Sequence, residues 1–284
     1  GILVDVDTVL LAGACGAKVD YPENEPARVV APSGESIEEI IDRINLKEVL
    51  NNERIQIYLE ALRIISSQCK GEIFVRGNAD QGPFGLAFLV YGMENFLVDL
   101  VDEEKENDIF ALLDRCYEVC LEFHKEVFST GDDCTSFGDS PSGPDLVSPA
   151  IYRKFAKPYQ KKLAEDLAKH NIKTVCHICG NTDSILEDMV ETGCSGFEID
   201  YKTDINKAKD ILKTKAVIFG NIDPSGVFAL GSVETVGETT KRLIDQCKDG
   251  GKFVIGAGCA LPPDTPEENI REFVRNVNTY GWYD

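Results

Sequence analysis

The sequence has few histidines and few basic residues for its length. Its 284 residues contain three His, and 29 Lys and Arg stand against 49 Asp and Glu, which gives a formal net charge of −20. Nucleic acids and anionic membrane surfaces are bound by basic patches, so this balance argues against both as partners. A small-molecule substrate and a protein partner remain compatible with an acidic surface.

Long apolar runs and nucleotide-binding loops are also missing. No run of 18 or more apolar residues occurs, and the start "GILVDVDTVLLAGACGAKVDYPEN" has no basic end of the kind found in secretory signals. We therefore expect a soluble, cytoplasmic protein. Neither a Walker loop nor a G-x-G-x-x-G pattern is present, so nothing in the sequence supports nucleotide binding.

Cysteine, by contrast, is frequent. The ten cysteines do not show the compact spacing of a disulfide framework, so metal binding, catalysis or burial are the better explanations for them. Cys116 and Cys120 lie one helical turn apart in "DRCYEVCLEF", which predicts packing in the core of a helix. His124 and His170 also lie in helical stretches and are predicted to be packing or surface residues.

From residue 70 onward, short β-branched runs alternate with amphipathic helical stretches. The predicted strands are 72–77, 133–139, 172–178, 195–201, 216–221 and 252–258, and the predicted helices are 104–129, 149–170, 182–192, 204–213, 232–248 and 265–279. This alternation predicts an α/β fold with a parallel sheet, and the number of units favours a (β/α)₈ TIM barrel formed by one domain, residues 1–284. An open doubly wound sheet is the alternative.

The N-terminal part is irregular. Residues 5–13, "DVDTVLLAG", are the candidate for the first strand, and residues 34–69 are predicted to form one or two helices. No segment is assigned to an eighth strand.

The stretch "TVCHICGN" combines two cysteines with one of the few histidines. If 172–178 is a strand, His177 and Cys179 face the same side at its C-terminal end, which is where α/β barrels carry their chemistry. Imidazole and thiolate are preferred zinc ligands, and Cys259 follows the last predicted strand, which neighbours the first in a closed barrel. These residues predict a zinc site with three protein ligands, while a buried strand that contains sulfur is the alternative.

Glu198 and Asp200 lie two residues apart on one face of a predicted strand in "GFEIDYKTD". Two buried carboxylates without a cation are costly, so a metal or a substrate is expected nearby. We predict that both act in catalysis, and that the exchangeable fourth zinc position is filled by one of them or by water. The alternative is an ion pair with Lys202 or Lys173.

Four further residues are candidates for substrate binding at or beside strand ends. Asp139 in "SFGDSPSG" ends a strand, and Phe84, after Gly82-Pro83, is predicted to shape the pocket wall. Asn221 and Asp223 in "GNIDP" are predicted either to contact substrate or to hold a turn with their side chains.

The motifs "VCHICGN", "FGNIDP" and "GCALPPDTPEENI" resemble the uroporphyrinogen decarboxylase superfamily, specifically its corrinoid-dependent methyltransferase branch. Segments 82–88, 136–159 and 220–224 follow in the order and spacing of that family. The resemblance covers nearly the whole chain and implies a barrel fold. It also implies a zinc ion held by His177, Cys179 and Cys259.

One departure separates the branches of this superfamily. Cys259 stands where the decarboxylases carry the histidine of a histidine-glycine pair, and the arginine-rich segment that grips substrate carboxylates has no counterpart. Asp7 does fall nine residues before Gly16, as the decarboxylase aspartate does before its glycine, which makes Asp7 a substrate-binding candidate. The cysteine at position 259 and the missing arginine-rich segment nevertheless disfavour decarboxylation.

The resemblance implies a zinc-dependent methyltransferase. It would move a methyl group between a corrinoid (cobalamin), carried by a partner protein, and a small substrate such as a thiol. The reverse direction, with a methyl ether or methylamine as donor and cob(I)amide as acceptor, stays open, as does the identity of the donor or acceptor. A metal-free decarboxylase and a barrel with a structural zinc are the remaining alternatives.

Overall fold

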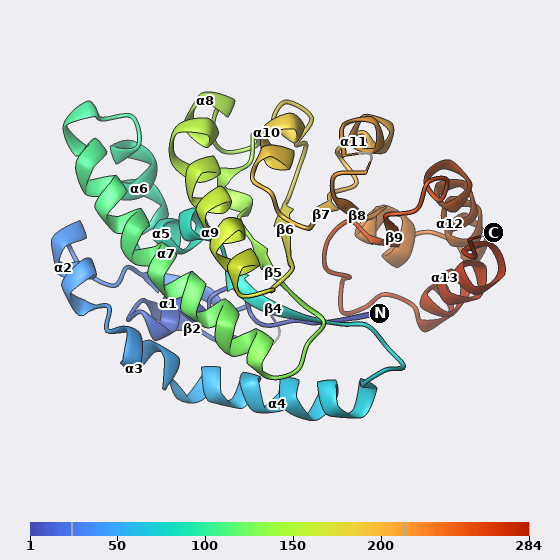
Figure 1. Ribbon diagram of the computed structural model, residues 1–284, viewed down its shortest axis with the longest axis horizontal. Helices are drawn as coiled ribbons and strands as arrows, with labels where there is room; N and C mark the ends of the chain where they lie inside the picture. The colour runs from blue at the N-terminus through green and yellow to red at the C-terminus, as the bar shows by residue number, and fades with distance from the viewer. Residues whose placement is uncertain (24, 213, 284) are drawn as a thin grey trace.

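A computed structural model describes residues 1–23, 25–212 and 214–283. Seven parallel strands form one sheet in the order β1-β4-β5-β6-β7-β8-β9, curled into a half-barrel (Figure 1). The strands are β1 (Ile2–Val4), β4 (Val75–Gln81), β5 (Cys134–Gly138), β6 (Thr174–Ile178), β7 (Gly196–Ile199), β8 (Val217–Ile222) and β9 (Phe253–Ala257). A separate antiparallel hairpin joins β2 (Lys18–Asp20) and β3 (Arg28–Ala31).

Figure 1 shows the helices in an arc around the strands, with α4 along one side and α12 and α13 next to each other at the C-terminal end. The helices are α1 (Leu10–Ala14), α2 (Ile37–Arg43), α3 (Leu46–Leu50), α4 (Glu53–Cys69), α5 (Pro83–Tyr91), α6 (Met93–Asp99), η1 (Glu103–Lys105), α7 (Glu106–Ser129), η2 (Ser140–Ser142), α8 (Pro149–Ile151), η3 (Tyr152–Ala156), α9 (Lys157–Lys169), α10 (Leu186–Glu191), α11 (Ile205–Leu212), η4 (Pro224–Ala229), α12 (Val233–Cys247) and α13 (Glu267–Tyr280).

The barrel-type α/β fold with alternating helices is confirmed. The strand order follows the chain without a reversal, which excludes the doubly wound alternative. In the part of the chain that the structure describes, this sheet has seven strands, and β1 and β9 do not pair. A cavity of about 210 Å³ separates them, lined by Leu3, Phe74 and Val254 among others.

Two N-terminal predictions were wrong. Residues 5–13 are not a strand, because β1 lies earlier, at Ile2–Val4, and α1 takes up the apolar run from Leu10. That run has no period-2 alternation, and its residues are buried on all sides, so its pattern could not separate strand from helix. Residues 34–69 form three helices rather than one or two. The side chains of Asn45 and Asn52 each accept hydrogen bonds from backbone N–H groups and cap the start of a new helix.

Helix α7 illustrates how the helices cover the sheet. Its buried residues recur at helical spacing and include Cys116 and Cys120, both fully buried, so their predicted packing role is confirmed. His124, on the same helix, is buried and contacts Thr135 Oγ1 at 2.7 Å through Nδ1. This histidine is therefore a packing residue, whereas His170 is exposed.

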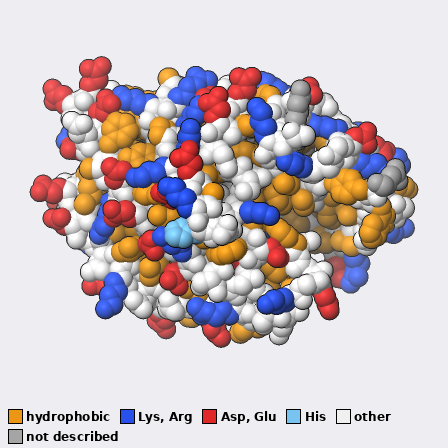
Figure 2. Space-filling model, in the orientation of Figure 1, with side chains coloured by type: hydrophobic (Ala, Val, Ile, Leu, Met, Phe, Trp, Pro, Cys, Tyr) orange, Lys and Arg blue, Asp and Glu red, His pale blue; other side chains and the backbone are white. Residues whose placement is uncertain are grey.

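Among the described side chains on the face shown in Figure 2, basic residues are interspersed with acidic ones and do not gather into one patch. No helix within residues 1–23, 25–212 and 214–283 combines the length and the hydropathy that a bilayer crossing requires.

Candidate metal centre

His177 lies on β6, in the middle of the sheet, and pairs with Gly138 on one side and Glu198 on the other. Its Nδ1 is 3.0 Å from the backbone carbonyl oxygen of Glu198, and its Nε2 is 3.0 Å from Cys179 Sγ. A carbonyl oxygen only accepts, so Nδ1 carries the proton and Nε2 faces the cysteine. Imidazoles that bind metals are oriented in this way by a bond at the other nitrogen.

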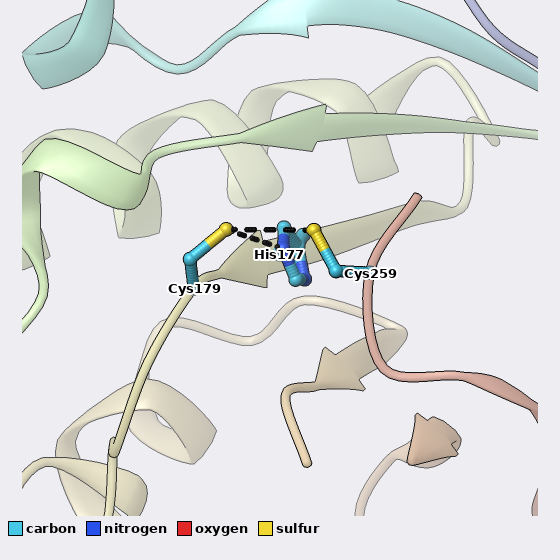
Figure 3. Close-up of side chains that lie close together, drawn as sticks. All are labelled: His177, Cys179 and Cys259. Atoms are coloured by element: carbon cyan, nitrogen blue, oxygen red, sulfur yellow. Dashed lines mark hydrogen bonds between the residues drawn. The ribbon is translucent and has the colours of Figure 1, made fainter. Parts of the chain in front are cut away.

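The two cysteines come from different strand ends. Cys179 follows β6 directly and Cys259 lies in the loop after β9, and Figure 3 shows their sulfur atoms converging on His177. The two Sγ atoms are 3.8 Å apart, and the three ligand atoms lie within 4.8 Å of one another. In the described part of the chain, no other three His, Cys, Asp or Glu side chains meet in this way.

The electrostatics of this group favour metal binding. Hydrogen bonds from Cys259 and His177 lower the pKa of Cys179 far below that of an ordinary thiol, while the Cys179 thiolate and burial raise the pKa of Cys259. Burial opposes a charge on His177, but the neighbouring Cys179 thiolate outweighs it and raises the pKa of the imidazole. A divalent cation would replace these shared protons and relieve the crowding of the two sulfur atoms.

The loop that carries Cys179 is held by hydrogen bonds to its backbone. The Cys179 N–H donates to Ser140 Oγ at 3.2 Å, and the Gly180 N–H donates to Asp200 Oδ2 at 2.9 Å. The other Asp200 oxygen accepts a hydrogen bond from the Lys202 N–H at 2.8 Å, so both carboxylate oxygens are hydrogen-bonded to the backbone of loops. Asp200, predicted to be catalytic, is buried and acts in the structure as a positioning residue for the loop after Cys179.

Glu198, the other predicted catalytic acid, forms a partly buried ion pair. Its Oε2 is 2.7 Å from Arg76 Nη2, and the Arg76 guanidinium stacks on Phe219 at 5.0 Å. Glu198 therefore forms an ion pair, as the alternative interpretation expected, but with Arg76 and not with Lys202 or Lys173. Lys202 pairs with Asp145 instead, at 3.6 Å. The available signal for Arg76 was that it is the one basic residue in the predicted strand 72–77.

Asp139 and Phe84 lie behind the cavity wall rather than on its surface. Asp139 is fully buried and accepts hydrogen bonds from the Gly85 N–H at 2.6 Å and from Gln160 Nε2 at 2.8 Å. Burial raises its pKa to about 6, and these two hydrogen bonds oppose the shift. Phe84 is fully buried against Phe96, with ring centroids 5.0 Å apart. The structure gives both side chains a packing role around the first turn of α5.

The remaining predicted substrate contacts also hold loops. Asn221 Nδ2 donates to the carbonyl oxygens of Asp200 and Thr203, both at 3.2 Å, and Asp223 accepts two N–H groups at the start of η4. The turn-holding alternative thus describes Asp223, whereas Asn221 holds the neighbouring loop after β7; a substrate contact of either residue stays a prediction. Asp7 pairs with Arg54, and the cavity beside the metal group is lined by its neighbours Asp5 and Thr8 instead.

A cavity of about 340 Å³ lies at the C-terminal ends of the strands and is lined by His177, Cys179 and Cys259. Its wall also contains Asn78 and Asp80, which the sequence analysis missed because it ended this strand at Gly77. The polar run "NADQ" before "GPFG" was the available signal. The cavity is thus lined both by the three candidate metal ligands and by polar residues at the end of β4.

Asp80 should make the stability of the protein depend on pH. Burial raises the pKa of Asp80 from 3.8 to about 7, so the folded protein binds a proton that the unfolded chain releases between these values. Folding stability should therefore fall as the pH rises from about 4 to 7, by up to roughly 4 kcal/mol from this group. Asp80→Asn should lose this slope in urea unfolding at pH 5 and pH 8. The exposed control Glu187→Gln should keep it, and an unchanged slope in Asp80→Asn would contradict the assignment.

Comparisons with known proteins agree with this geometry. The sequence matches the uroporphyrinogen decarboxylase (URO-D) family over residues 1–280. The methylcobamide:CoM methyltransferase MtbA of Methanosarcina acetivorans is 32% identical over 82% of this chain, which spans 66% of that protein's length. The MtbA of Methanosarcina mazei is 30% identical over 94% of this chain and 76% of its own.

The chain is also similar to a decarboxylase and to a methyltransferase of known structure. The uroporphyrinogen decarboxylase of Prochlorococcus marinus subsp. pastoris is 29% identical over 86% of this chain and 72% of its own. The structure of a methyltransferase from Methanosarcina mazei superposes with a TM-score of 0.88 at 24% identity, over 99% of this chain and 81% of that one. The superposition establishes the fold, and the match over residues 1–280 establishes that the chain belongs to the URO-D family.

Proposed function

We propose that the protein is a zinc-dependent methyltransferase that moves a methyl group between a corrinoid, carried by a partner protein, and a small substrate such as a thiol. The observation that carries this proposal is the group His177, Cys179 and Cys259, whose ligand atoms lie within 4.8 Å of one another. It is supported by the relatedness of the chain to methylcobamide:CoM methyltransferases. The partner and the corrinoid are proposed on the names of these relatives.

The donor set fits zinc, and its position fits a catalytic rather than a structural site. One imidazole nitrogen and two thiolates are typical zinc donors, and all three residues line the cavity at the strand ends. A structural zinc would have four protein ligands away from a cavity. Zinc bound here would supply a Lewis acid that stabilises a substrate thiolate or polarises the heteroatom of a methylated donor.

The protein's own residues orient the site and give part of it an apolar lining. The Glu198 carbonyl oxygen fixes the tautomer of His177, while Ser140 and Asp200 fix the loop that carries Cys179. Leu3, Leu89 and Phe137 give the cavity an apolar wall. Such a wall favours transfer of a methyl group, because the reacting sulfur or cobalt is not solvated by water.

Decarboxylation of a porphyrinogen fits this cavity poorly. The described residues that line it include Asp5, Asp80 and Glu198 but no lysine or arginine. Arg76 lines the adjacent cavity and is neutralised by Glu198. A substrate with several carboxylates would meet negative charge and find no cation to pair with.

The same charge distribution predicts a preference among thiols. Cationic 2-aminoethanethiol should react faster than neutral 2-mercaptoethanol, and 2-mercaptoethanesulfonate (CoM) should be slowest. We expect about a tenfold difference in kcat/KM between the two charged thiols, because the change from a positive to a negative group near Asp5 alters the interaction energy by about 1–2 kcal/mol in total. Asp5→Asn should reduce this difference. Faster reaction of the sulfonate would contradict the prediction.

A direct assay tests the proposed function. The purified, zinc-loaded protein should transfer the methyl group of free methylcobalamin to a thiol, or that of a methyl ether or methylamine to cob(I)alamin. The cobalt absorption spectrum follows both directions. Inertness toward all these substrates, together with decarboxylation of uroporphyrinogen, would overturn the proposal.

A further inference from the structure

One carboxylate on the cavity wall lies beside the metal-binding group without belonging to it. Glu198 on β7 pairs in register with His177 on β6, and both residues line the cavity of about 340 Å³. The Glu198 carbonyl oxygen is also the acceptor for His177 Nδ1, at 3.0 Å. Residues paired in register on adjacent strands project from the same face of a sheet, so the Glu198 side chain starts next to the imidazole. Carboxylate oxygen is a common zinc ligand, which makes Glu198 a natural fourth donor.

Arg76 turns this carboxylate away from the metal-binding group. Glu198 Oε2 lies 2.7 Å from Arg76 Nη2, and the two side chains are 17% and 9% exposed. Among the described residues, the group whose ligand atoms lie within 4.8 Å of one another contains His177, Cys179 and Cys259 but not Glu198. Arg76 and Glu198 also line the adjacent cavity of about 210 Å³ together. The ion pair therefore sets the direction of the Glu198 side chain.

The register of the sheet shows in which direction Arg76 draws the carboxylate. Arg76 on β4 is paired with Cys134 on β5, whereas His177 on β6 is paired with Gly138, four residues further along the same strand. Four residues of a strand span roughly 13 Å. Arg76 thus starts nearer the N-terminal ends of the strands, while the two cysteines of the metal-binding group follow the C-terminal ends of β6 and β9. The ion pair draws the carboxylate away from the two thiols.

Arg76 is itself fixed in place. It is buried, its guanidinium stacks on the Phe219 ring at 5.0 Å from the centroid, and Glu198 supplies the counter-charge that a buried cation needs. Asp200, the other acid predicted near the metal, uses both carboxylate oxygens on the backbone N–H groups of Gly180 and Lys202. Neither acid is thus free to coordinate a metal ion at this site.

We infer that Arg76 is a positioning residue that holds the Glu198 carboxylate away from the metal centre and keeps the fourth metal position open to substrate. This inference rests on the proposed function, because it needs a metal ion bound by His177, Cys179 and Cys259. The resting fourth position is then filled by water and not by Glu198. A thiol or a methylated substrate enters it without displacing a protein ligand.

Glu198→Gln, in the full chain loaded with Co(II), tests whether the carboxylate is a ligand. Gln has the shape of Glu and accepts a hydrogen bond from Arg76, so the variant should fold. Imidazole, a neutral ligand, is titrated in and followed by the visible absorption of the bound Co(II). The wild type and the variant should share one Co(II) spectrum, with imidazole dissociation constants that agree within about twofold, because Glu198 does not compete for the position. Imidazole affinity about tenfold higher in the variant, with a changed spectrum, would overturn the inference.

Arg76→Met removes the cation but keeps an apolar stem against Phe219. The freed carboxylate should then bind the metal ion, so zinc affinity should rise about tenfold in competition with a chromogenic chelator. The imidazole affinity of the Co(II) form should fall about tenfold, because only a minor fraction of the molecules keeps an open position. Added negative charge alone would tighten zinc binding but leave the binding of neutral imidazole unchanged. Arg76→Met/Glu198→Gln should return both affinities to the wild-type values.

Arg115→Met is the matched control, because Arg115 also forms an ion pair, with Glu118, but lies on α7 and does not line the cavity. It should leave both affinities unchanged. An unchanged imidazole affinity in Arg76→Met, with zinc still bound, would overturn the positioning role and leave the metal centre intact. A wild-type protein that binds neither zinc nor Co(II) would instead contradict the proposed function, and the role of Arg76 with it.

Discussion

Cys259→Ala is expected to lose nearly all of its zinc while it keeps its fold. The wild type should contain about one zinc ion per chain, and the variant less than about 0.1 after dialysis, because two remaining donors bind zinc far more weakly than three. The fold should persist because Cys259 is only half-buried, in the loop after β9, and the core packs without it. Metal analysis and circular dichroism measure the two effects.

A second cysteine variant controls for the loss of a thiol as such. Cys69 is also half-buried, at the end of α4, and does not line the cavity. Cys69→Ala should therefore retain about one zinc ion per chain. If Cys259→Ala retains a full complement as well, the assignment of the metal centre is wrong.

The meeting of His177, Cys179 and Cys259 could be predicted from the sequence because their positions are local to strand ends. His177 and Cys179 are two residues apart, and strand alternation places both on one side at the end where parallel strands carry their chemistry. Cys259 follows another strand end, so a curled parallel sheet brings it to the same cavity. The prediction of these three residues required only the position of each one relative to the end of its own strand.

The partners of the carboxylates could not be predicted in the same way. Glu198 pairs with Arg76, which lies 122 residues away on β4, and the nearby Lys202 points to Asp145 instead. Sequence proximity favoured the lysine, but the curvature of the sheet brings β4 and β7 together across its concave side. The burial of Asp139 was not predicted, because a strand end fixes the position of a residue but not the direction of its side chain, which here accepts the hydrogen bond of the Gly85 N–H in α5.

Asp80 was missed for a different reason. Asn, Asp and Gln are uncommon in strands, so a strand rich in apolar residues appeared to end at Gly77, although β4 continues to Gln81. The positive φ of Asp80 is fixed by long-range contacts with the segment after β1, which no local pattern contains. Breaks in local preference of this kind are typical of functional sites.

Cys179→Ala is expected to abolish methyl transfer between free methylcobalamin and a thiol. The sulfur of Cys179 is the donor that contacts both other members of the group, at 3.0 Å from His177 Nε2 and 3.8 Å from Cys259 Sγ. Its loss should lower kcat/KM by about 10³-fold or more, which corresponds to about 4 kcal/mol of transition-state stabilisation. Free cobalamin serves as substrate because it presents the same reacting carbon–cobalt bond. The absence of docking contacts should lower kcat/KM for the wild type and for each variant alike, so the comparison between them is preserved.

The matched control is Lys173→Ala, which removes an exposed side chain just before β6, at the end of that strand opposite His177 and Cys179. This variant should keep most of the wild-type rate in the cobalt absorption assay, since it leaves the cavity and the zinc content unchanged. Supplementing Cys179→Ala with excess zinc should not restore the rate, because the missing group is a donor rather than the ion. Full activity of Cys179→Ala, with zinc still bound, would show that the thiolates hold the ion for the fold alone and that methyl transfer takes place elsewhere in the barrel.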